Sequence, residues 1–261
     1  MTLPLAGLVV VVTRPATQAG RFAALATAAG ARPLLLPTLE IEPITLDTEW
    51  RDRLVPDDYD WTIYTSANAV ESALQQLPRP QRTQVAAVGR ATARALQQHG
   101  IAVSAIPRTT TDSEGLLELE CFAELRGRRI LILKGRGGRT LLSEELVRRG
   151  AEVVIGDVYQ RRQAAASPQA LDELRRACDA DQAVIAATSA EVLAALLALA
   201  PADRCPRLRD AALLVPGERV AAAARTHGWR GRLIVAPGAE DETMAQALAR
   251  AFASGSRPGT A

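Results

Sequence analysis

The 261-residue chain has few of the residues that mark metal and redox proteins. Its three cysteines, Cys121, Cys178 and Cys205, are far apart and form no CxxC pair, which argues against a metal site or a disulfide. The two histidines, His99 and His227, have no other ligand residues beside them. Each precedes a glycine, a pattern typical of a helix C-terminus. We therefore expect no metal site.

Charge of one sign and long apolar segments are also lacking. The net charge of +2 is too small for a surface that coats DNA, and Lys134 is the only lysine among 31 basic residues. No apolar run reaches the length of a transmembrane helix, and the first residues lack the pattern of a secretory signal peptide. The composition predicts a globular cytoplasmic protein that binds neither nucleic acid nor membrane.

Short β-branched runs alternate with helical patterns rich in alanine and leucine. Strands are expected at 8–13, 60–66, 84–89 and 182–189, and a helical pattern follows each of them. Continuous apolar strands separated by helices are typical of parallel sheets covered on both faces. Residues 254–261 have no apolar anchor and are expected to be disordered.

The second half of the chain resembles the first at an offset of roughly 120 to 130 residues, which is too long for a solenoid repeat. The matching segments are 7–13 with 127–134, 64–70 with 187–193, and 87–96 with 214–224. We infer two copies of one α/β module, with a ligand cleft between them as the natural site.

Several strand-to-helix turns are rich in small and hydroxyl residues. The unpaired N–H groups of a helix start attract carboxylate or phosphate oxygens, although simple N-capping by serine or threonine is the alternative. Such turns lie at the carboxyl ends of parallel strands, where ligands bind. The candidate anion-binding residues are Thr65, Ser66, Ala67 and Asn68, then Gly89, Arg90 and Thr92, and in the second copy Thr188, Ser189 and Gly217.

The stretch ILILKGRGGRTLLSEEL, residues 130–146, is similar to a nucleotide-binding loop. It matches neither the P-loop pattern nor the dinucleotide-binding pattern. Its lysine precedes the glycines, unlike that of a phosphate-binding P-loop, and the GxGxxG spacing of a dinucleotide loop is incomplete. Lys134 and Arg136 either attract an anion here or form a solvated basic turn. The counterpart in the first copy is Thr13-Arg14-Pro15. Ser113 belongs to a hydroxyl-rich segment, 109–115, that caps a helix or borders the cleft.

No Ser-His-Asp, Cys-His or HExxH constellation appears, and no pair of carboxylates suits acid–base catalysis. If the chain is an enzyme, it works mainly by binding and shaping an anionic substrate.

An ordered set of short motifs resembles the uroporphyrinogen-III synthase family. The likeness runs from about residue 7 to residue 252, and the motifs are Thr13-Arg14-Pro15, 65–70, 88–93, 112–116, Lys134-Gly135 and Val158-Tyr159. The resemblance implies two similar α/β domains of flavodoxin-like type, with parallel sheets flanked by helices and joined by a two-stranded linker.

The resemblance also implies a discontinuous division of the chain, whereas sequence periodicity alone places a single break near residue 126. Domain 1 comprises residues 1–37 with 163–253, and domain 2 comprises residues 44–156. The linker strands are 38–43 and 157–162.

The implied substrate is hydroxymethylbilane, a linear tetrapyrrole with carboxylate side chains on every ring. The implied reaction, that of a lyase, removes the terminal hydroxyl as water, inverts ring D and closes the macrocycle to uroporphyrinogen III. It requires no cofactor and no metal. The resemblance further implies a monomer that receives its substrate from hydroxymethylbilane synthase.

Tyr159 matches the family's linker tyrosine, which suggests a hydrogen bond to the departing hydroxyl; a packed interdomain tyrosine is the alternative. Thr92 matches a threonine near the substrate. Its counterpart lies near Glu218-Arg219, where many relatives have threonine, and a carboxylate there would repel an anionic substrate. The competing functions are a two-lobed module that binds a small anion without chemistry, and a nicotinamide oxidoreductase.

Overall fold

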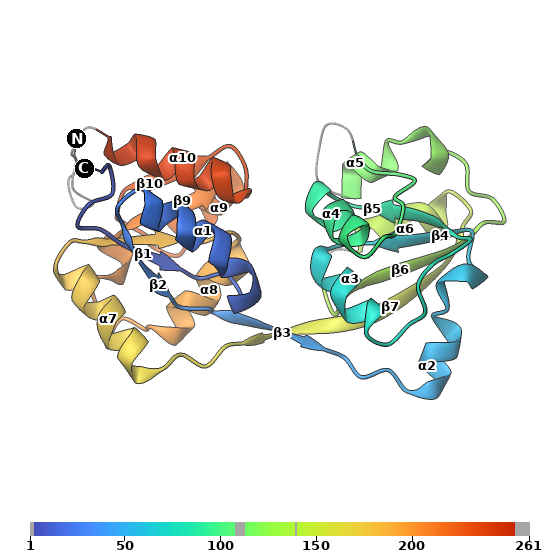
Figure 1. Ribbon diagram of the computed structural model, residues 1–261, viewed down its shortest axis with the longest axis horizontal. Coiled ribbons are helices and arrows are strands. Elements are labelled where there is room, and N and C mark those ends of the chain that lie inside the picture. The colour runs from blue at the N-terminus through green and yellow to red at the C-terminus, as the bar shows by residue number, and fades with distance from the viewer. Residues whose placement is uncertain (1–2, 108–112, 139, 254–261) are drawn as a thin grey trace. The chain divides into compact units, whose positions relative to one another are not determined.

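A computed structural model describes residues 3–107, 113–138 and 140–253 of the chain (Figure 1). The chain divides into two compact units. Unit 1 comprises residues 1–40 and 162–261, and unit 2 comprises residues 41–161. Both boundaries fall inside the segments expected as linkers, 38–43 and 157–162. The tail that was expected to be disordered, 254–261, lies outside the described residues.

Unit 1 is built on a parallel sheet in the order β10-β9-β8-β1-β2. Counted along the chain, this order is 2-1-3-4-5, which is the flavodoxin order. The strands are β1 (Val9–Val12), β2 (Arg32–Leu35), β8 (Ala183–Ala186), β9 (Ala212–Pro216) and β10 (Leu233–Ala236).

Helices cover both faces of the unit 1 sheet. Val10 and Val12 of β1 pack with Phe22 on the face that carries α1 and α10, whereas Val9 and Val11 pack on the opposite face with α7, α8 and α9. All four valines are buried, because successive side chains of a strand point to opposite faces. The helices are α1 (Ala16–Ala28), α7 (Pro168–Asp179), α8 (Ala190–Leu199), α9 (Glu218–Thr226) and α10 (Asp241–Phe252), with the short 3-10 helix η3 (Leu208–Asp210).

Unit 2 contains a sheet in the order β3-β7-β6-β4-β5, in which β4 to β7 run parallel. The strands are β3 (Leu39–Pro43), β4 (Trp61–Tyr64), β5 (Gln84–Ala87), β6 (Arg129–Gly135) and β7 (Glu152–Gln163). Ala164 N–H donates to the Thr38 carbonyl and Ile44 N–H to the Val158 carbonyl, so β3 runs antiparallel to β7. These two strands carry the chain from one unit to the other.

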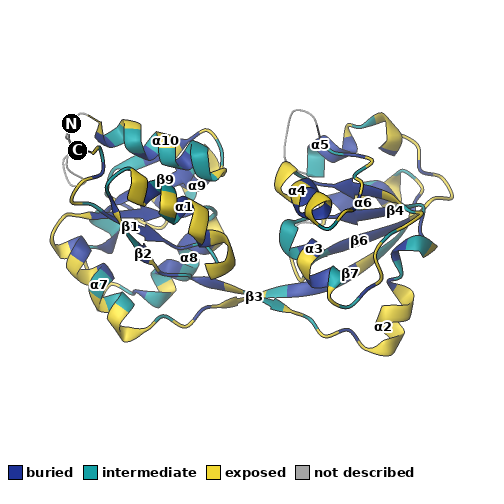
Figure 2. Ribbon diagram, in the orientation of Figure 1, coloured by how far each residue is buried: buried dark blue, intermediate teal, exposed yellow. Residues whose placement is uncertain are grey.

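The unit 2 sheet also carries helices on both faces, and its strands β4, β5 and β6 are mostly buried (Figure 2). Helices α3 (Ala67–Leu74) and α4 (Arg90–Gln98) pack on one face, and α5 (Ser113–Leu117), α6 (Leu141–Arg148) and η2 (Glu120–Phe122) pack on the other. Two short elements, α2 (Thr48–Arg53) and η1 (Pro56–Asp58), precede β4.

The internal repeat has a structural counterpart. Strands β1, β8 and β9 take the same relative places in the first sheet as β6, β4 and β5 take in the second. These are the strands of the three segment pairs that resemble each other in the sequence. The predicted fold class, two α/β units with parallel sheets flanked by helices, is confirmed.

Each unit has its own buried core, so we expect core mutations to act on one unit at a time. Phe22 of unit 1 and Phe122 of unit 2 are both fully buried. Phe22→Ala should cost about 3–5 kcal/mol of local stability through the cavity it leaves. Hydrogen exchange should then show lost protection in unit 1, and Phe122→Ala should give the reciprocal pattern. Equal loss in both units from either variant would contradict separate cores.

Candidate functional site

The carboxyl edge of the unit 2 sheet gathers the turns that the sequence singled out. Because β4, β5 and β6 run parallel, the N-termini of α3, α4 and α6 meet at one edge. Ser66 and Gly89 are the N-caps of α3 and α4. The unpaired N–H groups and the dipoles of these helices favour an anion at this edge.

Tyr159 lies at this edge and is only 2% exposed. Its hydroxyl is 3.1 Å from Ser66 Oγ, and Arg161 Nη2 donates to the same hydroxyl over 3.3 Å. The Arg161 guanidinium also lies 5.8 Å from the centre of the tyrosine ring. Ser66 Oγ accepts in addition from Ala69 N–H over 3.1 Å, which caps α3. The serine therefore caps a helix and contacts the phenol at once.

Gly135 makes room for Tyr159. A Cβ at Gly135 would lie 2.5 Å from Tyr159 Cζ, closer than any side chain tolerates. The next residue, Arg136, donates its N–H to the Tyr159 carbonyl over 2.7 Å. The ring thus packs on the backbone where β6 ends, and the first glycine of the glycine-rich stretch serves this contact.

Cations at the unit 2 edge come from two turns. Arg90 is the first residue of α4 and is exposed, and Lys134 and Arg136 stand at the end of β6. Arg136 Nη1 donates to Gln160 Oε1 over 3.3 Å. The turn between β4 and α3, residues 65–68, carries no charge of either sign. This edge therefore suits a ligand with several carboxylates.

The remaining predicted residues of unit 2 have mostly local roles. Thr65 Oγ1 donates to the Leu133 carbonyl over 3.3 Å, and Thr92 is buried in the first turn of α4. Ala67 and Asn68 are the first two residues of α3 and are half-buried. Ser113 is the first residue of α5. Residues 108–112, which include most of the hydroxyl-rich segment, lie outside the described residues.

At the corresponding edge of unit 1, the predicted site residues Thr13 and Arg14 bind to other residues of the same unit. Thr13 is fully buried, and its hydroxyl donates to the Ala186 carbonyl over 2.7 Å. Arg14 forms an ion pair with Asp241, donates to the Ala239 carbonyl over 3.0 Å, and lies over the ring of Phe22. The cation of Arg14 is therefore already neutralised within the unit.

The helix starts of unit 1 have the same kinds of N-cap residue as those of unit 2, but one of them carries a charge of the opposite sign. Ser189 caps α8 through Val192 N–H over 3.1 Å, with half-buried Thr188 just before it. Gly217 caps α9 at φ +84°, a conformation that favours glycine. Glu218 follows, and its carboxylate accepts from Arg225 over 3.4 Å. The α9 start thus carries a carboxylate where α4 carries the cation of Arg90.

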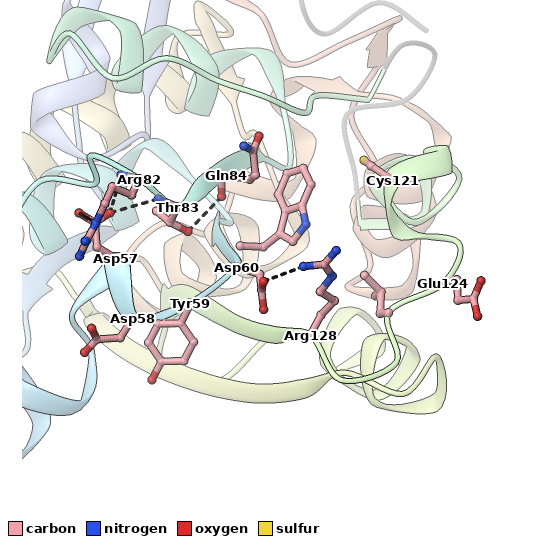
Figure 3. Close-up of a pocket in the computed structure, with 12 residues that line it drawn as sticks. Asp57, Asp58, Tyr59, Asp60, Arg82, Thr83, Gln84, Cys121, Glu124 and Arg128 are labelled. Carbon is pink, nitrogen blue, oxygen red and sulfur yellow. Dashed lines mark hydrogen bonds and ion pairs between the residues drawn. The ribbon is translucent and has the colours of Figure 1, made fainter.

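A pocket of about 750 Å³ lies at the opposite, amino edge of the unit 2 sheet (Figure 3). Two of its acidic residues, Asp57 and Asp60, accept hydrogen bonds from backbone N–H groups. Burial raises the pKa of Asp57, but N–H groups of the segment 81–83 donate to its carboxylate at 2.9–3.2 Å, and the net pKa is lowered. The Arg129 N–H and the Arg128 guanidinium likewise lower the pKa of Asp60. We assign these carboxylates a structural role.

Two cysteines that are distant in the sequence come together in unit 1. Cys178 and Cys205 are buried in one hydrophobic cluster as free thiols. The hydrogen bond that the Cys178 thiol donates to Cys205, together with burial, raises the pKa of Cys178. Within the described ranges, no group of three or more His, Cys, Asp or Glu residues is placed to hold a metal ion. None of the helices in those ranges combines the length and apolar character that a membrane span requires.

Known proteins resemble this chain in sequence and in fold. A family model described as Uroporphyrinogen-III synthase HemD matches residues 20–246. Uroporphyrinogen-III synthases of Escherichia coli K12 and Salmonella typhimurium are 31% and 33% identical, each over 92% of this chain and 99% of their own. The chain belongs to the uroporphyrinogen-III synthase family. The family and the synthase function predicted from the sequence are therefore confirmed.

Solved structures of the family show the same fold. A crystal structure of a mutant uroporphyrinogen III synthase from Thermus thermophilus gives a TM-score of 0.62 at 23% identity, over 95% of this chain and 99% of its own. The Helicobacter pylori enzyme gives a TM-score of 0.61 at 17% identity, over 92% and 96% of the two chains.

We expect the contact between Gly135 and Tyr159 to limit what position 135 tolerates. Gly135→Ala should lower stability by about 1–3 kcal/mol, because the added methyl overlaps the ring. When the ring has been removed by Tyr159→Ala, the further change Gly135→Ala should cost much less stability than it costs in the wild type. Chemical denaturation measures this coupling. The control, Gly20→Ala in α1, adds a methyl where no atom lies within 4 Å and should not destabilise. Simply additive effects at positions 135 and 159 would contradict the contact.

Proposed function

We propose that the chain acts on hydroxymethylbilane as a lyase that closes it to uroporphyrinogen III. The terminal C–O bond breaks, the hydroxyl leaves as water, and an azafulvene cation remains on ring A. The substituted carbon of ring D attacks this cation, and the resulting spiro intermediate opens and recloses with ring D inverted. The hydroxyl takes up one proton as it leaves, and the ring D carbon that makes the final bond loses one proton, so the net change is one molecule of water lost for each macrocycle formed.

The observation that carries this proposal is the anion-binding edge of unit 2. Three helix N-termini and the cations of Arg90, Lys134 and Arg136 meet there. A substrate with carboxylates on every ring can be held at several points by such an edge. Holding the flexible chain in one folded shape favours the inverted product over simple closure, because positioning lowers the entropic part of the barrier.

We assign to Tyr159 the hydrogen bond that assists the departing hydroxyl of the substrate. Because Arg161 donates to the phenol oxygen, the phenolic hydrogen is left to point at Ser66 or at a ligand. A phenol held in one orientation can donate to the leaving oxygen without reorganisation. Helix starts at Ser66, Ser189 and Gly217 support carboxylate binding by backbone N–H groups, and Thr13, Arg14, Thr92 and Ser113 remain predicted contacts. The monomeric state, the cytoplasmic location and the hand-over from hydroxymethylbilane synthase stay predictions.

Freshly prepared hydroxymethylbilane tests this function. The macrocycles formed with and without the protein are oxidised to porphyrins and separated into type I and type III isomers. We expect type III with the protein and type I without it. Type I alone in both reactions, with tight binding of the substrate, would favour the anion-binding module instead. Binding of NAD or NADP in calorimetry would favour an oxidoreductase.

Tyr159→Phe tests the role of the phenol. We expect turnover to fall at least about tenfold, since a positioned proton donor is lost, with a much smaller change in stability. Tyr59→Phe is the matched control, because Tyr59 is a buried tyrosine of the same unit whose hydroxyl donates to the Arg53 carbonyl over 2.6 Å. That variant should lose about 1 kcal/mol of stability and keep its turnover. A Tyr159→Phe protein that melts early but turns over normally would make Tyr159 a packing residue.

A further inference from the structure

Asp157 stands out on β7 because one of its carboxylate oxygens is buried without a partner. No described residue donates a hydrogen bond to Asp157 Oδ1, and this is the only buried side-chain oxygen or nitrogen in the described ranges with that property. A buried acceptor without a donor lowers the stability of the fold. A carboxylate at position 157 therefore calls for a reason other than packing.

The sheet register places Lys134 directly beside Asp157. Strands β6 and β7 are parallel, and Lys134 pairs with Asp157 immediately before a bulge that shifts Gly135 onto Tyr159. Neighbouring strands lie about 4.8 Å apart, which is well within the reach of a lysine side chain. Ile132, two residues before Lys134, packs in the cluster with α5 and α6, so alternation directs Lys134 to that face.

Asp157 lies on the same face of the sheet as Lys134. Gly156 abuts Leu54 and Leu133, which belong to the cluster on the opposite face, and Val158 packs there as well. The side chain between them is therefore directed to the face of α5 and α6. Neither Lys134 nor Asp157 forms an ion pair with any described residue, and their own carboxylate and ammonium are not in contact in the structure. The chain's single lysine thus shares a register position with the one buried carboxylate oxygen that lacks a hydrogen bond among the described residues.

We propose that Asp157 is a positioning residue: it holds the ammonium of Lys134 at the carboxyl edge of unit 2 and yields it to a carboxylate of the substrate. Rotation about the lysine side-chain bonds brings three donors to the unsatisfied oxygen. A substrate carboxylate that reaches this edge offers the ammonium a second anionic partner. This proposal rests on the proposed function for the identity of the substrate, but the pairing of the two residues can be tested without it.

The single lysine makes the pairing directly observable. Reductive methylation with ¹³C-formaldehyde labels Lys134 and the N-terminal amine, and it preserves the lysine charge. We expect the Lys134 resonance to be shifted and broadened in the wild type relative to Asp157→Asn. The control Asp172→Asn removes an exposed carboxylate from α7 and should leave the resonance unchanged. Adding uroporphyrin III, a stable polycarboxylate, should move the wild-type resonance again. Identical Lys134 resonances in the wild type and in Asp157→Asn would overturn the proposal.

Kinetics and stability give a second test on the unlabelled protein. Lys134→Met and Asp157→Asn should each raise KM about tenfold with little change in kcat, and the double variant should be no worse than either. Asp157→Asn should change the melting temperature little, because it keeps the shape of the side chain and gives up only one half-buried ion pair. A clear fall in melting temperature, or additive effects on KM, would contradict the positioning role. If the wild type forms no type III isomer, the proposed function fails, whereas the resonance comparison without ligand still decides the pairing.

Discussion

Parallel pairing of the strands within each unit is the constraint on which the candidate site depends. Strands that run in one direction end at one edge, and each following helix must begin there. Four N–H groups at each helix start lack partners within the helix, so the edge is supplied with donors before any side chain is considered. The serine caps at Ser66 and Ser189 use nearly the same backbone geometry in the two units. The fold thus supplies donors for the anion that we propose, and side chains adjust the charge around them.

The carboxyl edges of the two units differ in the charge that their side chains carry. Unit 2 keeps Arg90 and the Lys134-Gly135-Arg136 turn, with an uncharged turn between β4 and α3. Unit 1 neutralises Arg14 with Asp241 and places Glu218 at the start of α9. Because charges at a common edge act together on an approaching ligand, we expect the two edges to differ in their affinity for a polycarboxylate. We therefore place the main carboxylate contacts of the proposed reaction on unit 2.

Most of the architecture could be predicted from the sequence, because buried parallel strands can be recognised as short apolar runs between helical patterns. The discontinuous division could not, since periodicity alone divides the chain near residue 126, and only the family resemblance implied the interleaved arrangement. The residues of the candidate edge could be named because hydroxyl, glycine and cationic residues follow the strands. Their contacts were beyond prediction. Arg14 meets Asp241 across 227 positions of the chain, and Cys178 meets Cys205 with no CxxC spacing to indicate it.

The glycine-rich stretch after β6 shows why such contacts escape a sequence pattern. GxGxxG is a pattern for phosphate because its glycines let a backbone approach a ligand closely. Here Gly135 lets the backbone approach Tyr159, a side chain of the neighbouring strand, and the same need for space arises from packing. The glycine pattern therefore did indicate a close approach to the backbone, but the approaching group is a side chain of the protein and not a ligand. Arg161 belongs to the same group: it lies two residues after Tyr159 and bonds to its hydroxyl, and nothing in its own sequence neighbourhood marks it.

Strand β7 joins these features, because it is both a member of the unit 2 sheet and one of the two strands that continue into unit 1. Within five residues it carries Asp157 beside Lys134, Tyr159 over Gly135, and Arg161 against the phenol. A strand fixed on one side by β6 and on the other by β3 holds its side chains in a defined register. A phenol and a cation on such a strand keep their geometry without support from a loop. This rigidity suits a site whose chemistry depends on positioning more than on acid–base strength.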